Sequence, residues 1–219
     1  MSTIRPVKRE NSLSARVYLE LRRALMTGVY KPGEKVTIRA IADAAQVSFT
    51  PAREAVGRLI IEGALEYEGP KTVVVPVLNR HALEEVTAIR KRLEPLVTDL
   101  GAQRLSKPQV SQLHRIQNRL EKSMNRGNFR EVLRQNEEFH FLIYRCSGFM
   151  YAVQMIESCW MRIGPSLNLL YPEFSISRAG ISNHNALLAA LEAEKPFEAS
   201  NWITSDIEAG YARLSELIA

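Results

Sequence analysis

The stretch from Thr37 to Val75 constrains the fold of this chain most, because two short helical patterns and a hairpin pattern follow one another there directly. The first helical pattern starts after Thr37, a residue type that often caps a helix N-terminus. Its apolar residues recur at helical spacing, through Ile38, Ile41, Ala42 and Ala45. Gln46-Val47-Ser48 interrupts this pattern, which predicts a tight turn.

A second helix is predicted to open at Thr50 and Pro51. A threonine hydroxyl can cap the helix, and proline is tolerated at the first helical position because the N–H that it lacks would have no partner there. The apolar face of this helix consists of Ala52, Ala55, Val56, Leu59 and Ile60. Its opposite face carries Thr50, Arg53, Glu54 and Gly57. A helix that buries one stripe and exposes a hydroxyl and a guanidinium on the other is suited to the major groove of DNA.

Two short extended runs, 65–68 and 72–75, follow this helix and flank Gly69-Pro70-Lys71. We expect them to pair as a hairpin with a basic tip. Helix, turn, helix and hairpin in this order predict a winged helix-turn-helix, which is a DNA-binding module. The alternative that these spacings leave open is a small helical subdomain with a hairpin and no role in DNA binding.

The charge of the chain supports the DNA-binding interpretation. Residues 1–80 carry 13 Lys and Arg against 8 Asp and Glu, whereas residues 81–219 carry 16 of each, so the net charge of +5 belongs to the first third. Several basic residues precede the motif and can neutralise DNA phosphates in a sequence-independent, salt-sensitive way. They are Arg5, Lys8, Arg9, Arg16, Arg22 and Arg23.

The 219 residues, 46% of them hydrophobic, are enough for two domains with separate cores. We expect a DNA-binding domain at 1–78 and a second domain at 79–219, joined by a short linker at 76–79. The N-terminus lacks the apolar segment of a secretion signal, and no apolar run reaches the roughly 20 residues of a membrane span. Cys146 and Cys159 form no CxxC pair and suit a reducing compartment. We therefore expect a cytoplasmic protein in which both cysteines serve packing.

From residue 79 onward the sequence predicts helix after helix and no strand. We expect six helices, at about 79–104, 108–125, 128–146, 149–170, 175–194 and 196–218. Capping or helix-breaking residues separate them, for example Ser106-Lys107-Pro108 and Arg126-Gly127-Asn128. Such a chain packs as an all-α bundle. The predicted fold class is mostly α, a winged helix-turn-helix followed by a six-helix bundle.

Polar residues occupy several positions that the helical periodicity assigns to the core of this bundle, namely Asn136, His140, His184 and Asp206. Buried polar groups cost about 1–3 kcal/mol each when unsatisfied, so polar groups on inward faces call for a common partner. Two imidazoles, a carboxylate and an amide oxygen suit a divalent transition metal such as Zn, Ni or Mn. The alternative is that each histidine is a core residue whose ring is satisfied by a neighbouring carbonyl.

Both halves of the chain resemble a known family. The N-terminal motif is similar to the GntR superfamily pattern LA…VS-x-TPVREAL…L…EG, through Ala42, Val47-Ser48-Phe49-Thr50-Pro51-Ala52-Arg53-Glu54-Ala55-Val56, Leu59 and Glu62-Gly63. The C-terminal half resembles the FCD domain of the FadR branch, through Arg90-x-x-Leu93-Glu94-Pro95, Asn136-x-x-Phe139-His140, Asn183-His184, Leu188 and Ala190-Leu191. The helix count is similar to that of the VanR-like subgroup.

This resemblance implies a dimeric, nucleoid-associated bacterial transcription factor whose C-terminal domain binds a small carboxylate, often next to a buried metal. The family places an aspartate and three histidines around that metal, at the positions of Asn136, His140, His184 and Asp206. Asn136 can still ligate through its oxygen, and Asp206 is itself a sound ligand, so a metal site is preserved. Without a metal, the same residues would line a polar effector pocket.

Three further residues are effector-binding candidates. Arg90 lies on an apolar stripe, and an inward guanidinium would hold a ligand carboxylate through two hydrogen bonds. The alternative for Arg90 is an ion pair with Glu94, four residues later, on the helix surface. Arg162 and Tyr171 are the other two candidates, and the sequence does not fix where they point.

On the DNA side, the resemblance implies contacts from Arg39, Ser48, Thr50, Arg53 and Gly69, and the basic wing tip adds Lys71. Phe49 departs from the family, in which an arginine frequently reads guanine at this position. Phenylalanine cannot hydrogen-bond a base edge, so we expect Phe49 to make apolar contact, for instance with a thymine methyl. Arg39 and Arg53 would then carry more of the specificity.

These inferences predict a DNA-binding regulator that is not an enzyme, in the family's commoner form a repressor. A dimer would bind two half-sites of a palindromic operator about one helical turn apart. An effector that binds the two dimer shapes unequally would change operator affinity. A metal-free ligand-responsive regulator and a constitutive dimeric DNA binder remain alternatives.

A metal-dependent hydrolase built on His140, His184 and Asp206 is a further alternative. It would need a general base nearby, and Glu137 and Glu138 lie off the predicted inward stripe.

Overall fold

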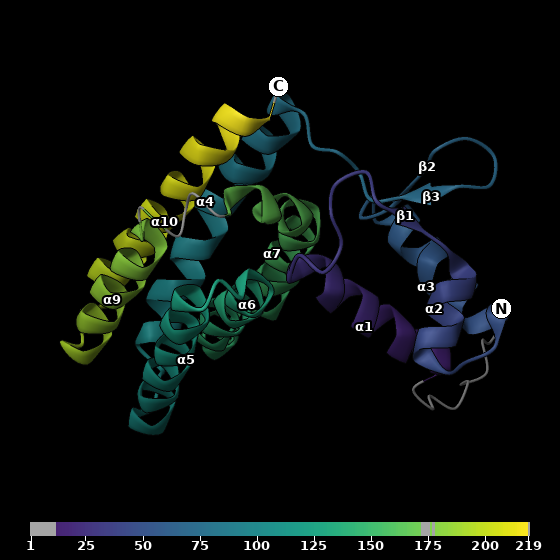
Figure 1. Ribbon diagram of the computed structural model, residues 1–219. Helices are drawn as coiled ribbons and strands as arrows, with labels where there is room; N and C mark the ends of the chain where they lie inside the picture. The colour runs from purple at the N-terminus through teal and green to yellow at the C-terminus, as the bar shows by residue number, and fades with distance from the viewer. Residues whose placement is uncertain (1–11, 172–175, 177, 219) are drawn as a thin grey trace, which may run out of the picture.

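The computed structural model describes residues 12–171, 176 and 178–218, and it forms two parts that pack against each other (Figure 1). The N-terminal part contains α1 (Leu13–Met26), β1 (Lys35–Val36), α2 (Ile38–Ala45), α3 (Phe49–Ile61), β2 (Glu66–Tyr67) and β3 (Val73–Val74). The C-terminal part contains α4 (Arg80–Ala102), α5 (Lys107–Asn125), α6 (Phe129–Cys146), α7 (Met150–Ile163), the 3₁₀ helix η1 (Gly164–Leu170), α9 (Ala179–Glu192) and α10 (Pro196–Leu217). The predicted fold class, a winged helix-turn-helix followed by an all-helical bundle, is confirmed.

The helix-turn-helix forms largely as its sequence predicts. The Thr37 hydroxyl caps α2 by accepting the Ala40 N–H at 3.2 Å, and the helix ends at Gln46 in the left-handed region. The predicted start of the second helix is wrong, because α3 begins at Phe49 with Ser48 at its N-cap. Thr50 is therefore inside the first turn, together with Pro51. Proline is tolerated there because the first N–H groups of a helix have no intrahelical acceptor.

The wing is a small antiparallel sheet. Its hairpin pairs β2 with β3, with Tyr67 opposite Val73, and Gly69 takes a φ of 76° in the connection. The hairpin prediction is confirmed. A third strand, β1, pairs with the other edge of β3, and two residues are too few to show the alternation by which a strand is recognised in a sequence.

Helix α1 was not predicted, and it joins the two parts of the molecule. Its inner face packs on α3 and on α7, and consists of Val17, Tyr18, Leu21, Leu25 and Met26. Arg22 on this helix forms an ion pair with Glu157 of α7 at 2.9 Å. The phosphate role expected for Arg22 is therefore not supported, whereas Arg16 and Arg23 are exposed. Arg5, Lys8 and Arg9 lie outside the described residues.

The bundle helices lie within a few residues of their predicted ends. Helix α10 runs alongside both α4 and α9, and α5 packs on α6 (Figure 1). The predicted fourth helix divides, because the chain tightens into η1 at Gly164-Pro165. The predicted start of the fifth helix, at 175, lies outside the described residues. In the described ranges, no helix is both long and apolar enough to cross a membrane.

At the centre of the contact between the two parts, the backbones come so close that no side chain fits between them. A Cβ on Gly164 would collide with the backbone oxygens of Leu25 and Met26, at the end of α1. The Asn168 amide in η1 donates to the backbone oxygens of Gly28 at 2.8 Å and Tyr30 at 3.3 Å. Through η1, the helical bundle therefore holds the turn that comes after α1.

Candidate metal centre and ligand cavity

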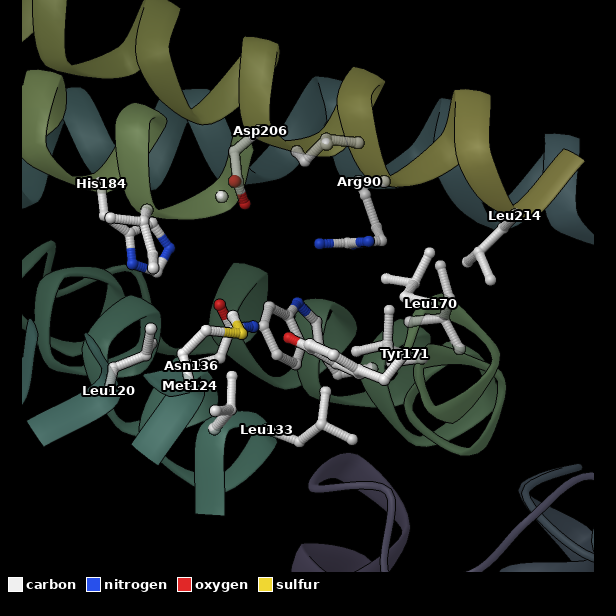
Figure 2. Close-up of a pocket in the computed structure, with 18 residues that line it drawn as sticks. Arg90, Leu120, Met124, Leu133, Asn136, Leu170, Tyr171, His184, Asp206 and Leu214 are labelled. Atoms are coloured by element: carbon white, nitrogen blue, oxygen red, sulfur yellow. The ribbon is translucent and has the colours of Figure 1, made fainter. Parts of the chain in front are cut away.

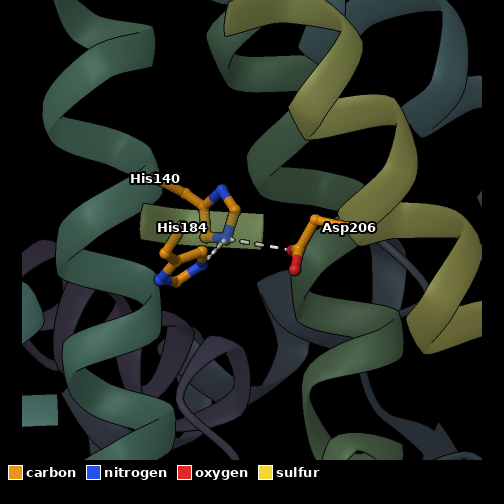
Figure 3. A group of neighbouring side chains, drawn as sticks. All are labelled: His140, His184 and Asp206. Carbon is orange, nitrogen blue, oxygen red and sulfur yellow. Dashed lines mark hydrogen bonds and ion pairs between the residues drawn. The ribbon is translucent and has the colours of Figure 1, made fainter. Parts of the chain in front are cut away.

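Three candidate ligands from three helices converge in the core of the bundle. His140 comes from α6, His184 from α9 and Asp206 from α10, and one ligand atom of each lies within 4.8 Å of the others (Figure 3). The two histidines are 1% and 2% exposed, and the Asp206 side chain is 16% exposed. Three of the four side chains predicted as metal ligands are thus brought together.

The two ring nitrogens of His140 have different surroundings. Nδ1, the outer nitrogen, points away from the cluster and is hydrogen-bonded, whereas Nε2, the inner nitrogen, faces the cluster. Nδ1 of His140 lies 3.1 Å from the Tyr144 hydroxyl. That hydroxyl donates its single proton to Glu94 Oε2 at 2.7 Å, so its oxygen accepts the Nδ1–H of His140. In the neutral ring, Nε2 then carries a lone pair. It faces Nε2 of His184 at 3.1 Å and Asp206 Oδ2 at 3.4 Å.

His184 is arranged in the same way. Its Nδ1 lies 2.9 Å from Oε1 of Gln117, an acceptor, so Nδ1 carries the proton. The Gln117 amide is oriented by its own NH₂ group, which donates to Glu121 at 3.2 Å. Burial lowers the pKa of His184 to about 3, so the ring is neutral at pH 7 and Nε2 is a second inward lone pair.

With both rings neutral, the centre of the cluster has no positive charge. Burial alone would raise the pKa of Asp206, but His140, His184 and Arg90 outweigh it and hold the pKa below its ordinary value. An ionised carboxylate and two nitrogen lone pairs face one another. A divalent cation or a proton on His140 would satisfy them, and nitrogen and oxygen donors of this kind fit zinc and its neighbours.

A cavity of about 60 Å³ adjoins the cluster (Figure 2). Its polar rim contains Arg90, Asn136, Tyr171, His184 and Asp206. Most of the remaining wall is apolar and includes Leu120, Met124, Val132, Leu133, Ile163, Leu167, Leu170, Ile181, Ile207 and Leu214. Asn136 is half-buried one helical turn before His140, and its amide is directed into the cavity (Figure 2). It can therefore add an oxygen to the donor set.

The sequence left two alternatives for Arg90, an inward guanidinium and an ion pair with Glu94, and the structure shows both. Its guanidinium is buried and extends into the cavity, and its Nε and Nη2 donate to the two Glu94 oxygens at 2.6 and 3.3 Å. The ion pair is therefore in the core and not on the helix surface. Burial disfavours the charge of Arg90, but the neighbouring Glu94 more than compensates and raises the arginine pKa above its ordinary value.

Glu94 is a candidate site residue that the sequence did not assign to the site. Its side chain is 0% exposed and accepts hydrogen bonds from Arg90, from the Tyr144 hydroxyl and from the Trp160 indole N–H at 2.9 Å. It thus connects the cation in the cavity wall to the ring of His140. Its position four residues after Arg90 was a signal, but the same spacing is common on solvent-exposed helix faces.

Of the two other effector candidates, Tyr171 lies at the cavity and Arg162 does not. Tyr171 lines the cavity and stacks on Phe129 with ring centroids 4.6 Å apart, and burial raises its pKa. Arg162 does not line it. The Arg162 guanidinium donates to the backbone oxygens of Ser158 and Glu62, the second of which belongs to the winged-helix part. An effector role for Arg162 is therefore not supported by its position.

Glu137 also differs from expectation. It was placed off the inward stripe of α6, yet it is 5% exposed, on a helix that also contacts α7. Its carboxylate lies 3.7 Å from Arg145, and burial raises its pKa. Because Glu137 does not line the cavity, it adds no general base to the metal cluster.

The predicted DNA-contacting residues all lie on the surface of the winged-helix part. They are Arg39, Ser48, Phe49, Thr50, Arg53, Gly69 and Lys71, and each is exposed. Phe49 is 52% exposed at the start of α3, and the Ser48 side chain makes no capping hydrogen bond. Their roles in DNA binding stay predictions.

Comparison with known families identifies both parts of the chain. The model "Bacterial regulatory proteins, gntR family" matches residues 13–75, and "FCD domain" matches residues 85–209. The HTH-type transcriptional regulator McbR of Escherichia coli (strain K12) is 31% identical over 185 residues, which cover 84% of each chain. The Nta operon transcriptional regulator of Aminobacter aminovorans is 25% identical, over 86% of this chain and 88% of its own.

Solved structures give the same picture. The structure of E. coli McbR/YncC has a TM-score of 0.86 at 28% identity and covers 94% of this chain and 98% of its own. A GntR regulator from Rhodococcus sp. RHA1 has a TM-score of 0.75 at 18% identity, over 94% of this chain and 99% of its own. The second likeness shows the shared fold alone.

Proposed function

The chain belongs to the GntR family of transcriptional regulators, and on this premise we propose that a divalent metal and a small carboxylate in its FCD domain control its affinity for DNA. The family and domains make it a DNA-binding regulator with an effector-binding domain, and not an enzyme. The metal, the carboxylate, the repressor role and the dimer are the parts that we propose.

One observation carries the proposal of a metal. The inner nitrogens of His140 and His184 both lack a proton in the neutral rings, because Tyr144 and Gln117 accept the outer N–H of each. Asp206 adds a carboxylate within reach of both. Two core histidines without a metal role would be expected to direct at least one N–H toward the other. Outer hydrogen bonds of this kind orient histidines that ligate metals.

The carboxylate site follows from Arg90. Its guanidinium uses one edge for Glu94, and the remaining N–H groups can donate to a ligand in the cavity. A bound metal would supply positive charge to the other end of the same carboxylate. Asn136 and Tyr171, on the polar rim, would complete its surroundings.

We further propose that two copies bind a palindromic operator and repress transcription until the effector arrives. One winged helix reads too few bases to select a site in a genome. The packed pair α4 and α7 exposes large apolar side chains that a second copy would cover, namely Ile89, Leu96, Tyr151 and Met155. Membership of the VanR-like subgroup stays a prediction.

Thermal unfolding tests the metal. The full chain is stripped with a chelator, and its Tm is measured with and without Zn²⁺, Ni²⁺ or Mn²⁺. Binding at a hundredfold excess over Kd contributes about 2.7 kcal/mol, which is several degrees in Tm. We expect this rise in the wild type and in His114→Ala, whose histidine is not one of the cluster residues and pairs with Glu192 at the surface. We expect none in His140→Ala. A rise of equal size in His140→Ala, or no rise in the wild type, would contradict a metal at this cluster.

A further inference from the structure

We infer that the cavity selects a short-chain monocarboxylate, an acid with one carboxylate and a small apolar body. This inference rests on the proposed function, and it narrows the class of effector from carboxylates in general.

The cavity wall carries a single cationic side chain. Among the described residues that line it, Arg90 is the only lysine or arginine. One edge of its guanidinium is already bound to Glu94. The free edge can hold one carboxylate, and in the proposed function the metal binds the other end of that same carboxylate. A second carboxylate on the ligand would then meet no further cation in the described wall.

The polar rim adds no second cation to the described wall. Its other charged side chain is the carboxylate of Asp206, and its remaining polar groups are an amide, a phenol and an imidazole. A second carboxylate held near this rim would lie close to a like charge in a largely buried place, which is unfavourable.

The wall away from the polar rim is apolar, and the cavity is small. Its side chains there are mostly leucine, isoleucine, valine and methionine. Such a wall favours a hydrocarbon body over a second polar group. A cavity of about 60 Å³ favours a short body over a long chain.

Butyrate and succinate are the matched probes, because they share a four-carbon chain and differ only in replacing a methyl group by a second carboxylate. Isothermal titration calorimetry on the Zn²⁺-loaded full chain is expected to give a Kd for butyrate at least about tenfold below that for succinate. Octanoate tests the size of the cavity and is expected to bind more weakly than butyrate. Chelator-treated protein is expected to bind none of the three.

A second cation should change this preference. Leu167→Lys adds an ammonium to the cavity wall at a half-buried position, and the gap between butyrate and succinate is expected to narrow. Leu169→Lys is the matched control, since Leu169 is exposed, lies in the same 3₁₀ helix and does not line the cavity. The control should keep the wild-type preference.

The outcomes separate this inference from the function on which it rests. Succinate binding as tightly as butyrate to the wild type overturns the monocarboxylate inference and leaves the carboxylate effector standing. A metal that raises Tm while no carboxylate binds overturns the carboxylate effector, and the inference with it. Butyrate binding equally well after chelation overturns the part of the proposed function in which the metal holds the carboxylate.

Discussion

A methyl group on Gly28 would lie 2.8 Å from Cδ1 of Leu133, a residue that also forms part of the cavity wall. Gly28 belongs to the turn after α1, in the DNA-binding part, and Leu133 belongs to α6 of the bundle. A single layer of side chains thus separates the cavity from the DNA-binding part. We expect a ligand in the cavity that displaces this layer to displace the turn as well.

The 3₁₀ helix η1 also connects the cavity to the DNA-binding part. Leu167 and Leu170 line the cavity, while Asn168 between them holds the backbone of Gly28 and Tyr30. Packed interfaces tend to have discrete arrangements and do not deform continuously, so small shifts at a ligand can be passed on through them. We regard η1 as the element that couples the effector to DNA affinity.

Asn168→Ala should therefore uncouple ligand binding from DNA binding. The side chain does not line the cavity, so the Kd for metal and for butyrate should stay within about twofold of wild type. The change in operator affinity on adding butyrate should be reduced or lost, because the amide no longer holds the turn. Fluorescence anisotropy with a labelled operator measures the response, and Asn201→Ala, an exposed residue of α10, serves as the control. An unchanged response in Asn168→Ala would rule out this route.

Tyr144→Phe tests the hydrogen bonds behind the metal cluster. The substitution removes the acceptor for His140 Nδ1 and a donor to Glu94, while it keeps the buried ring. Loss of such outer partners typically costs 10–100-fold in metal affinity, and we expect a weakening of about that size for Zn²⁺. Competition with a chromophoric chelator gives the Kd, and Tyr151→Phe is the control because Tyr151 is 84% exposed. Equal affinities in the two variants would mean that Tyr144 does not orient His140.

Much of the site was visible in the sequence, because a helix repeats its faces regularly. His140, His184 and Asp206 were placed inward from the 3–4 spacing of their apolar neighbours, and they meet in the core. Arg90 was placed on the same inward side. Periodicity assigns a residue to a face, and for helices packed as a bundle that is enough to predict which side chains converge.

The surroundings of Glu94, the direction of Arg162 and the packing of α1 depend on contacts that periodicity does not encode. Glu94 is a structural hub because Tyr144 and Trp160 reach it from α6 and α7, and nothing in its local sequence indicates that. Arg162 points to the other part of the molecule because the backbone oxygen of Glu62 is there to accept. Helix α1 was overlooked because its arginines were interpreted as phosphate contacts, although Arg22 pairs with Glu157.

Glu137→Gln should stabilise the protein at neutral pH. Burial raises the pKa of Glu137 in the folded state above its value in the unfolded chain, and the neighbouring Arg145 only partly offsets this. The folded state therefore holds the proton more tightly, and stability is lost as pH rises from the unfolded pKa through the folded one. A neutral glutamine avoids this loss, and we expect a gain of up to about 1 kcal/mol at pH 7.

The advantage of Glu137→Gln should shrink as the pH falls from the folded-state pKa toward the unfolded value of 4.5. Below that value it should be gone, because the carboxyl is then protonated in both the folded and the unfolded wild type. Urea unfolding across pH 4–8 measures it. Glu138→Gln is the matched control, because Glu138 pairs with Arg119 and Arg134 nearer the surface and should lose a little stability when neutralised. A loss of stability in Glu137→Gln at pH 7 would mean that its pairing with Arg145 outweighs burial.

Arg53→Ala should abolish specific operator binding and leave the bundle intact. Arg53 is exposed on α3, and Phe49 on the same helix cannot form the hydrogen bonds that an arginine there would form with guanine. Losing a bidentate base contact costs about 1–3 kcal/mol per half-site, so a symmetric dimer should lose at least about thirtyfold in affinity. Non-specific binding should fall far less, because phosphate contacts dominate it. Arg115→Ala, an exposed change on α5, controls for net charge, and operator affinity that is equal in the two variants would remove Arg53 from base recognition.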